Sequence, residues 1–189
     1  MTQRRARIAD AGIALLARRG RPGLTHRAVD AEAGLPAGST SYYARTRAAL
    51  LELVVHRLAE LDLDPGGRAE PPAPTDADSL ADLLAGYVHG RLTGNRERTL
   101  ARYELSLEAV HHPGVREVLV TTGAPFRTVA ADLLAGLGSP DPQRHGRLLV
   151  ACCDGLVLDA VAGAGSAHQP GLEELRRSLR DLLTGMLPG

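Results

Sequence analysis

The chain has 189 residues, and its 22 basic side chains balance its 22 acidic ones. Hydrophobic residues make up 44% of the sequence and aromatic residues 3%, with no Trp. The hydrophobic share excludes a disordered chain. A core built from Leu, Val and Ala favours packed helices over a β-sandwich, so an all-α fold is predicted.

Three features of the sequence indicate a cytoplasmic protein. No apolar run reaches the roughly 18 residues of a transmembrane helix. The N-terminus MTQRRARIADAG lacks the apolar segment of a signal peptide. Cys152 and Cys153 are adjacent, which disfavours a disulfide between them, and no second pair has metal-ligand spacing. We therefore expect buried, reduced thiols, no membrane association, no metal and no cofactor.

The charge is unevenly distributed along the chain. Residues 1–57 hold ten Arg and four acidic residues, a net charge of +6, and residues 58–189 carry the compensating −6. Such asymmetry indicates a basic module that meets a polyanion, joined to a module that does not.

Three helices are predicted before residue 45. Apolar residues recur at helical spacing over residues 4–19, and Gly20 ends that helix. Thr25 is a suitable N-cap for a second helix, and Gly34 is suited to its C-terminal end. After a Leu-Pro turn, a short third helix is expected over residues 37–43.

The rest of the chain is also predicted to be helical. A connecting helix over residues 46–64 is capped by Thr46, and a Pro/Gly-rich loop follows over residues 65–78. Further apolar stripes at helical spacing predict helices over residues 79–92, 96–111, 115–135, 144–162 and 172–187. The helix over 144–162 is apolar on almost all sides and is expected to be buried on more than one face.

The second and third helices, with a Gly-containing turn between them, indicate a helix-turn-helix unit. In such a unit the second helix enters the major groove of DNA. The run Gly38-Ser39-Thr40-Ser41 is small and polar, as a surface close to DNA requires. Tyr42 and Tyr43 offer hydroxyl groups to phosphates and ring faces to sugars or thymine methyl groups.

Residues 4–61 resemble the DNA-binding domain of the TetR family, the tetracycline-repressor-like regulators. The resemblance is carried by LTHRAVDAEAGLPAGSTSYYARTRAALL, with Thr25, Ala33-Gly34 before the turn, Gly38-Ser39 in the recognition helix, and Arg47 before Leu50-Leu51. It implies an N-terminal three-helix DNA-binding domain (residues 1–45). The DNA contacts that it implies are made by Thr25, His26, Arg27, Ala37, Gly38, Ser39, Ser41, Tyr42, Tyr43 and Arg47.

Two positions depart from the family pattern. Ser41 stands where the family often has Tyr, a role that Tyr42 and Tyr43 can take over. Ala44 stands where the family usually has a large apolar residue, which predicts weaker packing behind the recognition helix.

The resemblance further implies that residues 79–189 form a C-terminal helical domain for ligand binding and dimerisation. The last two helices, about 141–163 and 171–187, would pair with those of a second copy as a four-helix bundle. Gly155 and its small neighbours would allow close approach of helices. A dimer of this kind would match a near-palindromic DNA operator, because two recognition helices about 34–36 Å apart reach successive major grooves.

The same resemblance predicts a pocket for a small-molecule effector among the C-terminal helices. Its expected lining residues are Leu83, Tyr87, Arg91, Tyr103, Leu107, Phe126, Val129, Leu133, Leu149, Cys153 and Leu156. Polar groups that could orient a ligand are Tyr87, Arg102, Tyr103, Glu104, Glu108, His111 and Asp154. Asp154 lies in an otherwise apolar helix, where a carboxylate is costly unless a partner such as Arg102, the dimer seam or a ligand accommodates it.

These features predict a dimeric transcriptional regulator that a small molecule releases from its operator. A repressor is favoured over an activator, because blocking a promoter requires only that the protein occupies it. One alternative is a sequence-tolerant DNA-binding or architectural protein without a ligand. An enzyme is the other, but the sequence has no nucleophile elbow, P-loop, GxGxxG or Cys/His metal set. The neighbours His111 and His112 point to different faces of a helix. We therefore expect no catalytic residues.

Overall fold

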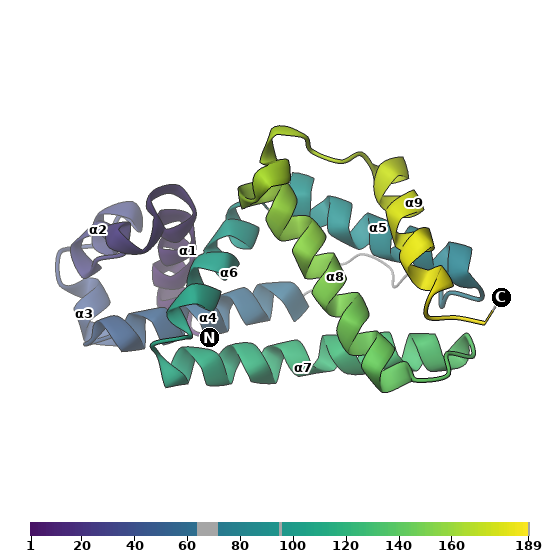
Figure 1. Cartoon of the computed structure of the whole chain (residues 1–189). Helices are drawn as coiled ribbons and strands as arrows, with labels where there is room; N and C mark the ends of the chain where they lie inside the picture. The colour runs from purple at the N-terminus through teal and green to yellow at the C-terminus, as the bar shows by residue number, and fades with distance from the viewer. Residues whose placement is uncertain (64–71, 95, 189) are drawn as a thin grey trace. The chain divides into compact units, whose positions relative to one another are not determined.

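The structure is a computed structural model that describes residues 1–63, 72–94 and 96–188. Within these ranges the chain is helical and contains no strand (Figure 1), which confirms the predicted all-α fold. The α-helices are α1 (Gln3–Gly23), α2 (His26–Glu32), α3 (Ser39–Tyr43), α4 (Arg47–Leu63), α5 (Ala77–Thr93), α6 (Arg96–Glu108), α7 (Pro113–Gly136), α8 (Pro142–Ala162) and α9 (Leu172–Thr184). A 3-10 helix, η1 (Ala164–Ala167), was not predicted. Of the predicted loop over residues 65–78, residues 65–71 lie outside the described residues.

The chain folds into two compact units. The first comprises Met1–Arg68 and Glu97–Thr122, and the second comprises Ala69–Arg96 and Gly123–Gly189. Almost all of α6 and the first part of α7 therefore belong to the unit that holds α1–α4. The sequence instead predicts them in the C-terminal domain. The functional boundaries predicted for the domains stay predictions.

The first unit has one hydrophobic core, to which α1, α4 and α6 all contribute. The apolar stripes predicted for α1 and α4 are buried in it, and the residues that are 2% exposed or less include Ile8, Leu15, Leu16, Leu50, Leu51, Val54 and Leu58. Leu105 of α6 is fully buried in the same core. This scaffold is what the two short helices α2 and α3 pack against.

Two threonines cap helices of the first unit as predicted. The Thr25 hydroxyl oxygen accepts a hydrogen bond from the Ala28 amide at 3.1 Å, at the start of α2. The Thr46 hydroxyl accepts one from the Ala49 amide at 3.1 Å, at the start of α4. Each bond satisfies an N–H group that the helix itself leaves without a partner.

Gly34 ends α2 with a left-handed backbone conformation, at φ +60°. The Leu35 amide donates to the Asp30 carbonyl at 2.8 Å, and the Gly34 amide donates to the Ala31 carbonyl at 3.1 Å. This pair of bonds is the Schellman motif, which reverses the chain after a helix. The turn between α2 and α3 therefore depends on a residue that tolerates positive φ.

Replacing Gly34 with Ala is expected to lower the free energy of unfolding by about 1–2 kcal/mol, because a Cβ atom is strained in the left-handed region. Gly86 is the matched control, since it lies inside α5 and an added Cβ would meet no atom within 4 Å. Gly86→Ala should raise stability by roughly 0.5–1 kcal/mol. Urea unfolding followed by circular dichroism measures both changes, and equal effects of the two substitutions would contradict the assignment.

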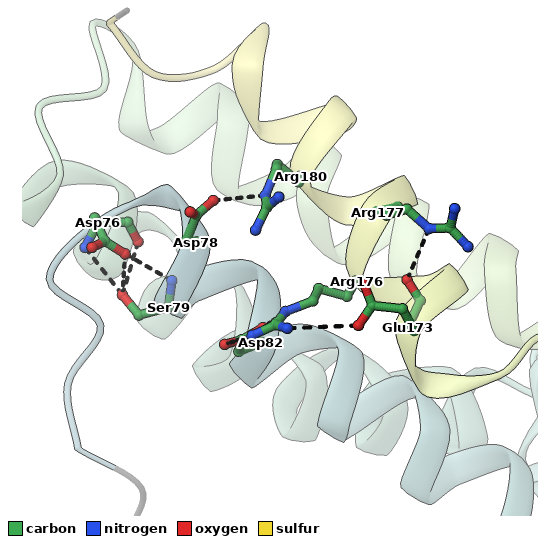
Figure 2. Close-up of polar contacts among 8 residues, drawn as sticks. All are labelled: Asp76, Asp78, Ser79, Asp82, Glu173, Arg176, Arg177 and Arg180. Carbon is green, nitrogen blue, oxygen red and sulfur yellow. Dashed lines mark hydrogen bonds and ion pairs between the residues drawn. The ribbon is translucent and has the colours of Figure 1, made fainter.

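In the second unit, α9 packs along α5. Its predicted apolar stripe is buried at Leu175, Leu179 and Leu183. Its polar side reaches α5 through ion pairs (Figure 2). The Arg176 guanidinium donates two hydrogen bonds to the Asp82 carboxylate. These bonds lower the pKa of Asp82 below its ordinary value.

The helix α7 meets the length and composition of a membrane span, with a mean hydropathy of 1.2 over 18 residues, although charged residues interrupt its apolar run. Val115, Ala131 and Leu134 on this helix are at most 1% exposed within the protein. Burial does not extend along the whole helix, since 17% of the 18-residue window is buried.

Candidate nucleic-acid interface

A buried carboxylate anchors the short helix α3. The Asp30 side chain of α2 is 4% exposed and accepts hydrogen bonds from the Gly38 and Thr40 amides, both at 2.7 Å. It also accepts the Thr40 hydroxyl at 2.6 Å. A helix of five residues is not stable alone, so these three bonds, with the packing of Thr40, determine where α3 lies.

The electrostatics of Asp30 agree with this role. Burial by itself raises the pKa of a carboxyl group, but the Thr40 hydroxyl and the amides of Thr40 and Gly38 outweigh it. The pKa of Asp30 is therefore lowered, and the carboxylate is charged at neutral pH. Sequence reasoning missed Asp30, because an acid in HRAVDAE looks like an exposed helix residue.

Thr40, which was not among the predicted DNA contacts, is the member of the small polar run that faces inward. Its side chain is fully buried and bound to Asp30. The helix begins at Ser39, two residues later than predicted, because Gly38 adopts φ +91° and serves as the N-cap.

The outward side of α3 carries Ser41 and Tyr42, and Tyr42 is 80% exposed. Tyr43 is partly buried against the core of the first unit. The two rings meet edge to face, with centroids 5.1 Å apart. The partly buried Tyr43 ring thus supports the Tyr42 ring, whose outer end packs against no other part of the described chain.

His26, predicted to contact DNA, is the first residue of α2, and its side chain reaches the end of α3. Its Nε2 atom is 2.6 Å from the carbonyl oxygen of Ala44. Ala44, directly after α3, is 1% exposed. The imidazole therefore holds the two helices of the motif together.

Arg47 also makes contacts within the protein. Its guanidinium donates to the Leu24 carbonyl at 2.7 Å and to the Arg21 carbonyl at 2.9 Å. It thereby fixes the segment between α1 and α2 to the start of α4. Whether Arg47 additionally reaches a phosphate stays a prediction.

The remaining residues predicted to contact DNA are all accessible to solvent. They lie close to α3 or at the start of α2. Thr25, Arg27, Ala37 and Gly38 are exposed and Ser39 is partly exposed. The first unit, whose sequence carries a net positive charge, thus contains a helix-turn-helix. The outer surface of this motif consists of small polar and aromatic side chains. This arrangement defines a helix-turn-helix DNA-binding protein.

Comparisons with known proteins agree with this class. The sequence profile described as "Tetracyclin repressor-like, C-terminal domain" matches residues 75–189. A search of curated proteins gave no match. The chain belongs to the TetR family of transcriptional regulators, as its sequence indicates.

Solved structures of similar proteins cover nearly the whole chain. A TetR family member from Streptomyces coelicolor is 29% identical over 100% of both chains, with a TM-score of 0.69. The multidrug binding protein EbrR, complexed with proflavin, is 32% identical over 95% of this chain and 99% of its own, with a TM-score of 0.64. A transcriptional regulator from Rhodococcus is 23% identical over 100% of both chains and shares the fold with a TM-score of 0.82.

The residues predicted to line an effector pocket are distributed over both units. Leu149 and Cys153 are buried, and Leu83, Leu133, Leu156 and Tyr103 are partly buried. Burial raises the pKa of the Cys153 thiol to about 12, so this group is a neutral thiol at physiological pH. The exposed members of the set are Tyr87, Leu107, Phe126, Val129 and Asp154.

Several polar members of that set have other environments than expected. The Asp154 side chain is exposed, so α8 does not take this carboxylate out of water. Glu104 and Glu108 bind Arg21, which lies in the last turn of α1. The Arg91 guanidinium lies 5.9 Å from the centroid of the Tyr87 ring. The described residues include no group of three His, Cys, Asp or Glu side chains arranged to hold a metal ion.

Proposed function

We propose that the protein is a dimeric, cytoplasmic, non-enzymatic repressor that binds a near-palindromic operator and is released by a small-molecule effector. The observation that carries the DNA-binding part is the outward surface of α3, where Ser41 and Tyr42 are exposed while Asp30 and Thr40 anchor the helix from beneath. A rigidly held helix with a free polar face suits the reading of base edges.

An exposed apolar stripe on α8 supports the dimer. Leu148 and Leu158 are each 43% exposed, and Ala151, Gly155 and Ala162 are exposed at the same helical spacing. Isolated apolar residues on a surface are ordinary, but a stripe with small residues at its centre suits close packing of two helices. This agrees with the predicted bundle formed by the last two helices of each copy.

Relatives support the effector. EbrR has been crystallised with ethidium and with proflavin, and a transcriptional regulator from Saccharomonospora viridis with choline. We infer that this chain also takes a small organic molecule, which favours a dimer geometry unable to bind DNA. The candidate lining residues within the second unit are Leu83, Tyr87, Phe126, Val129, Leu149, Cys153 and Asp154.

Replacing Tyr42 with Ala should weaken binding to the DNA upstream of the gene by about 1–3 kcal/mol, because the ring and hydroxyl contact the duplex. Stability should change little, since the side chain is 80% exposed. Tyr42→Phe isolates the hydroxyl contribution, and His56→Ala on the exposed side of α4 is the control. Fluorescence anisotropy at about 150 mM salt reports the Kd. Equal Kd values for wild type and Tyr42→Ala would mean that α3 is not the recognition helix.

A further inference from the structure

One buried carboxylate of α6 has no evident task in DNA recognition. The Glu108 side chain is 3% exposed, although its partner Arg21 is 56% exposed. The Arg21 Nη1 atom lies 2.8 Å from Glu108 Oε1, and His112 Nε2 lies 3.1 Å from the other oxygen. A buried acid is costly unless it is paired, so this pair holds Arg21 in a defined position.

A second carboxylate of α6 binds the backbone of the same residue. The Arg21 amide donates to Glu104 Oε2 at 3.0 Å. Gly20, directly before it, has φ +60° and ψ −169°, which breaks the helical path of α1. The last turn of α1, after the break at Gly20, is therefore held by α6 through both the side chain and the backbone of Arg21.

From Arg21 the contacts continue to the helix-turn-helix. Its carbonyl accepts Arg47 of α4 at 2.9 Å, and Arg47 also binds the Leu24 carbonyl at 2.7 Å. The next residue, Thr25, is the N-cap of α2 and an exposed candidate for phosphate contact. Two contacts from α6 to Arg21, followed by the contacts from Arg21 to Arg47 and from Arg47 to Leu24, thus connect α6 to the residue before Thr25, all within the first unit.

We propose that Glu108 is a positioning residue for DNA binding, which acts through Arg21 and Arg47 to place the start of α2 against the DNA. The proposal rests on the proposed function. It assigns to Glu108 and Glu104 a task other than contact with an effector.

The sign of one mutational effect distinguishes this role from simple electrostatics. Replacing Glu108 with Gln removes a negative charge, which on charge grounds alone should strengthen binding to DNA. The positioning role predicts the opposite, a loss of affinity of about tenfold. Glu117→Gln is the matched control, because Glu117 is an exposed acid of α7 in the same unit.

Arg21 provides an independent arm of the experiment. Arg21→Gln leaves the Glu108 carboxylate buried without its cationic partner, so affinity should fall, and adding Glu108→Gln should restore part of it. If Arg21 instead contacts a phosphate, the slope of log Kd against log salt should fall by about 0.9, and the second substitution should restore nothing. If Glu108→Gln fails to fold, Glu104→Ala tests the positioning role instead, because it removes only the contact with the Arg21 amide. The positioning role predicts that this variant also binds DNA more weakly.

These titrations use the full-length protein and a duplex that covers the region upstream of its gene. Weakened binding by Glu108→Gln, an unchanged salt slope for Arg21→Gln and partial restoration in the double variant are expected. Unchanged or tighter binding by Glu108→Gln and Glu104→Ala, with binding by wild type intact, would overturn the inference alone. Failure of the wild type to bind this duplex would overturn the proposed function, and the inference with it.

Discussion

Replacing Asp30 with Ala is expected to lower the free energy of unfolding by about 2–3 kcal/mol and to abolish specific DNA binding. The substitution leaves the Gly38 and Thr40 amides and the Thr40 hydroxyl without their acceptor. Buried donors without partners cost about 1–3 kcal/mol, and bonds to a charged group are at the upper end. Because α3 is too short to hold its place alone, its outer surface would no longer be presented to DNA.

Glu32 provides the matched control for Asp30, since it is an acid on the same helix. Its ion pair with Arg18 is exposed to solvent, and such pairs contribute about 0–1 kcal/mol. Glu32→Ala should therefore leave both urea unfolding and operator affinity close to wild type. If Asp30→Ala behaved like Glu32→Ala, the anchoring role of Asp30 would be wrong.

The pH dependence of stability gives a second readout for Asp30. Its folded pKa is lowered, so its contribution to stability is present above the unfolded value of about 3.9 and is lost as the pH falls through the folded value. The difference in unfolding free energy between wild type and Asp30→Asn should thus shrink as the pH is lowered from 7 to 3. A difference that grows toward acid pH would contradict the lowered pKa.

A charge placed in the stripe of α8 should dissociate the proposed dimer. Leu158→Glu puts a carboxylate where two α8 helices would pack, and burying an unpaired charge costs several kcal/mol. We expect the dimer dissociation constant to rise at least about 100-fold. DNA affinity should fall with it, because a single recognition helix reads only one half-site.

Gln143→Glu is the control for this substitution. Gln143 is also exposed on α8 but lies outside the stripe, so the same charge there should leave the dimer intact. Sedimentation velocity over a range of protein concentrations measures the monomer–dimer equilibrium, and circular dichroism verifies that both variants fold. A Leu158→Glu protein that remained dimeric would place the interface elsewhere.

Local signals in the sequence were sufficient for the existence of the α-helices and for several of their caps, while some helix ends differ by two to four residues. Thr25 and Thr46 cap helices, and Gly34 ends α2, because the preferences of these residue types act within a few positions along the chain. The helix η1 escaped prediction because AGSA has no periodic pattern and no capping residue.

The functional surface was only partly predictable, because side-chain partners distant in sequence decide which groups face outward. Nothing in the sequence shows that Thr40 turns inward to Asp30, ten residues earlier. An arginine such as Arg47 has the same signature whether it binds a phosphate or the Leu24 carbonyl, 23 residues away. The role of Glu108 likewise depends on Arg21, from the other end of the first unit's sequence.

Competition for DNA binding tests the central claim most directly. Purified protein would be titrated into a labelled duplex from the region upstream of its gene, at about 150 mM salt, with and without a large excess of random DNA. The proposed function predicts that binding survives the competitor, because specific complexes are typically 10³–10⁷ times tighter than non-specific ones. Loss of binding in proportion to the competitor would contradict a sequence-specific regulator and favour the architectural alternative.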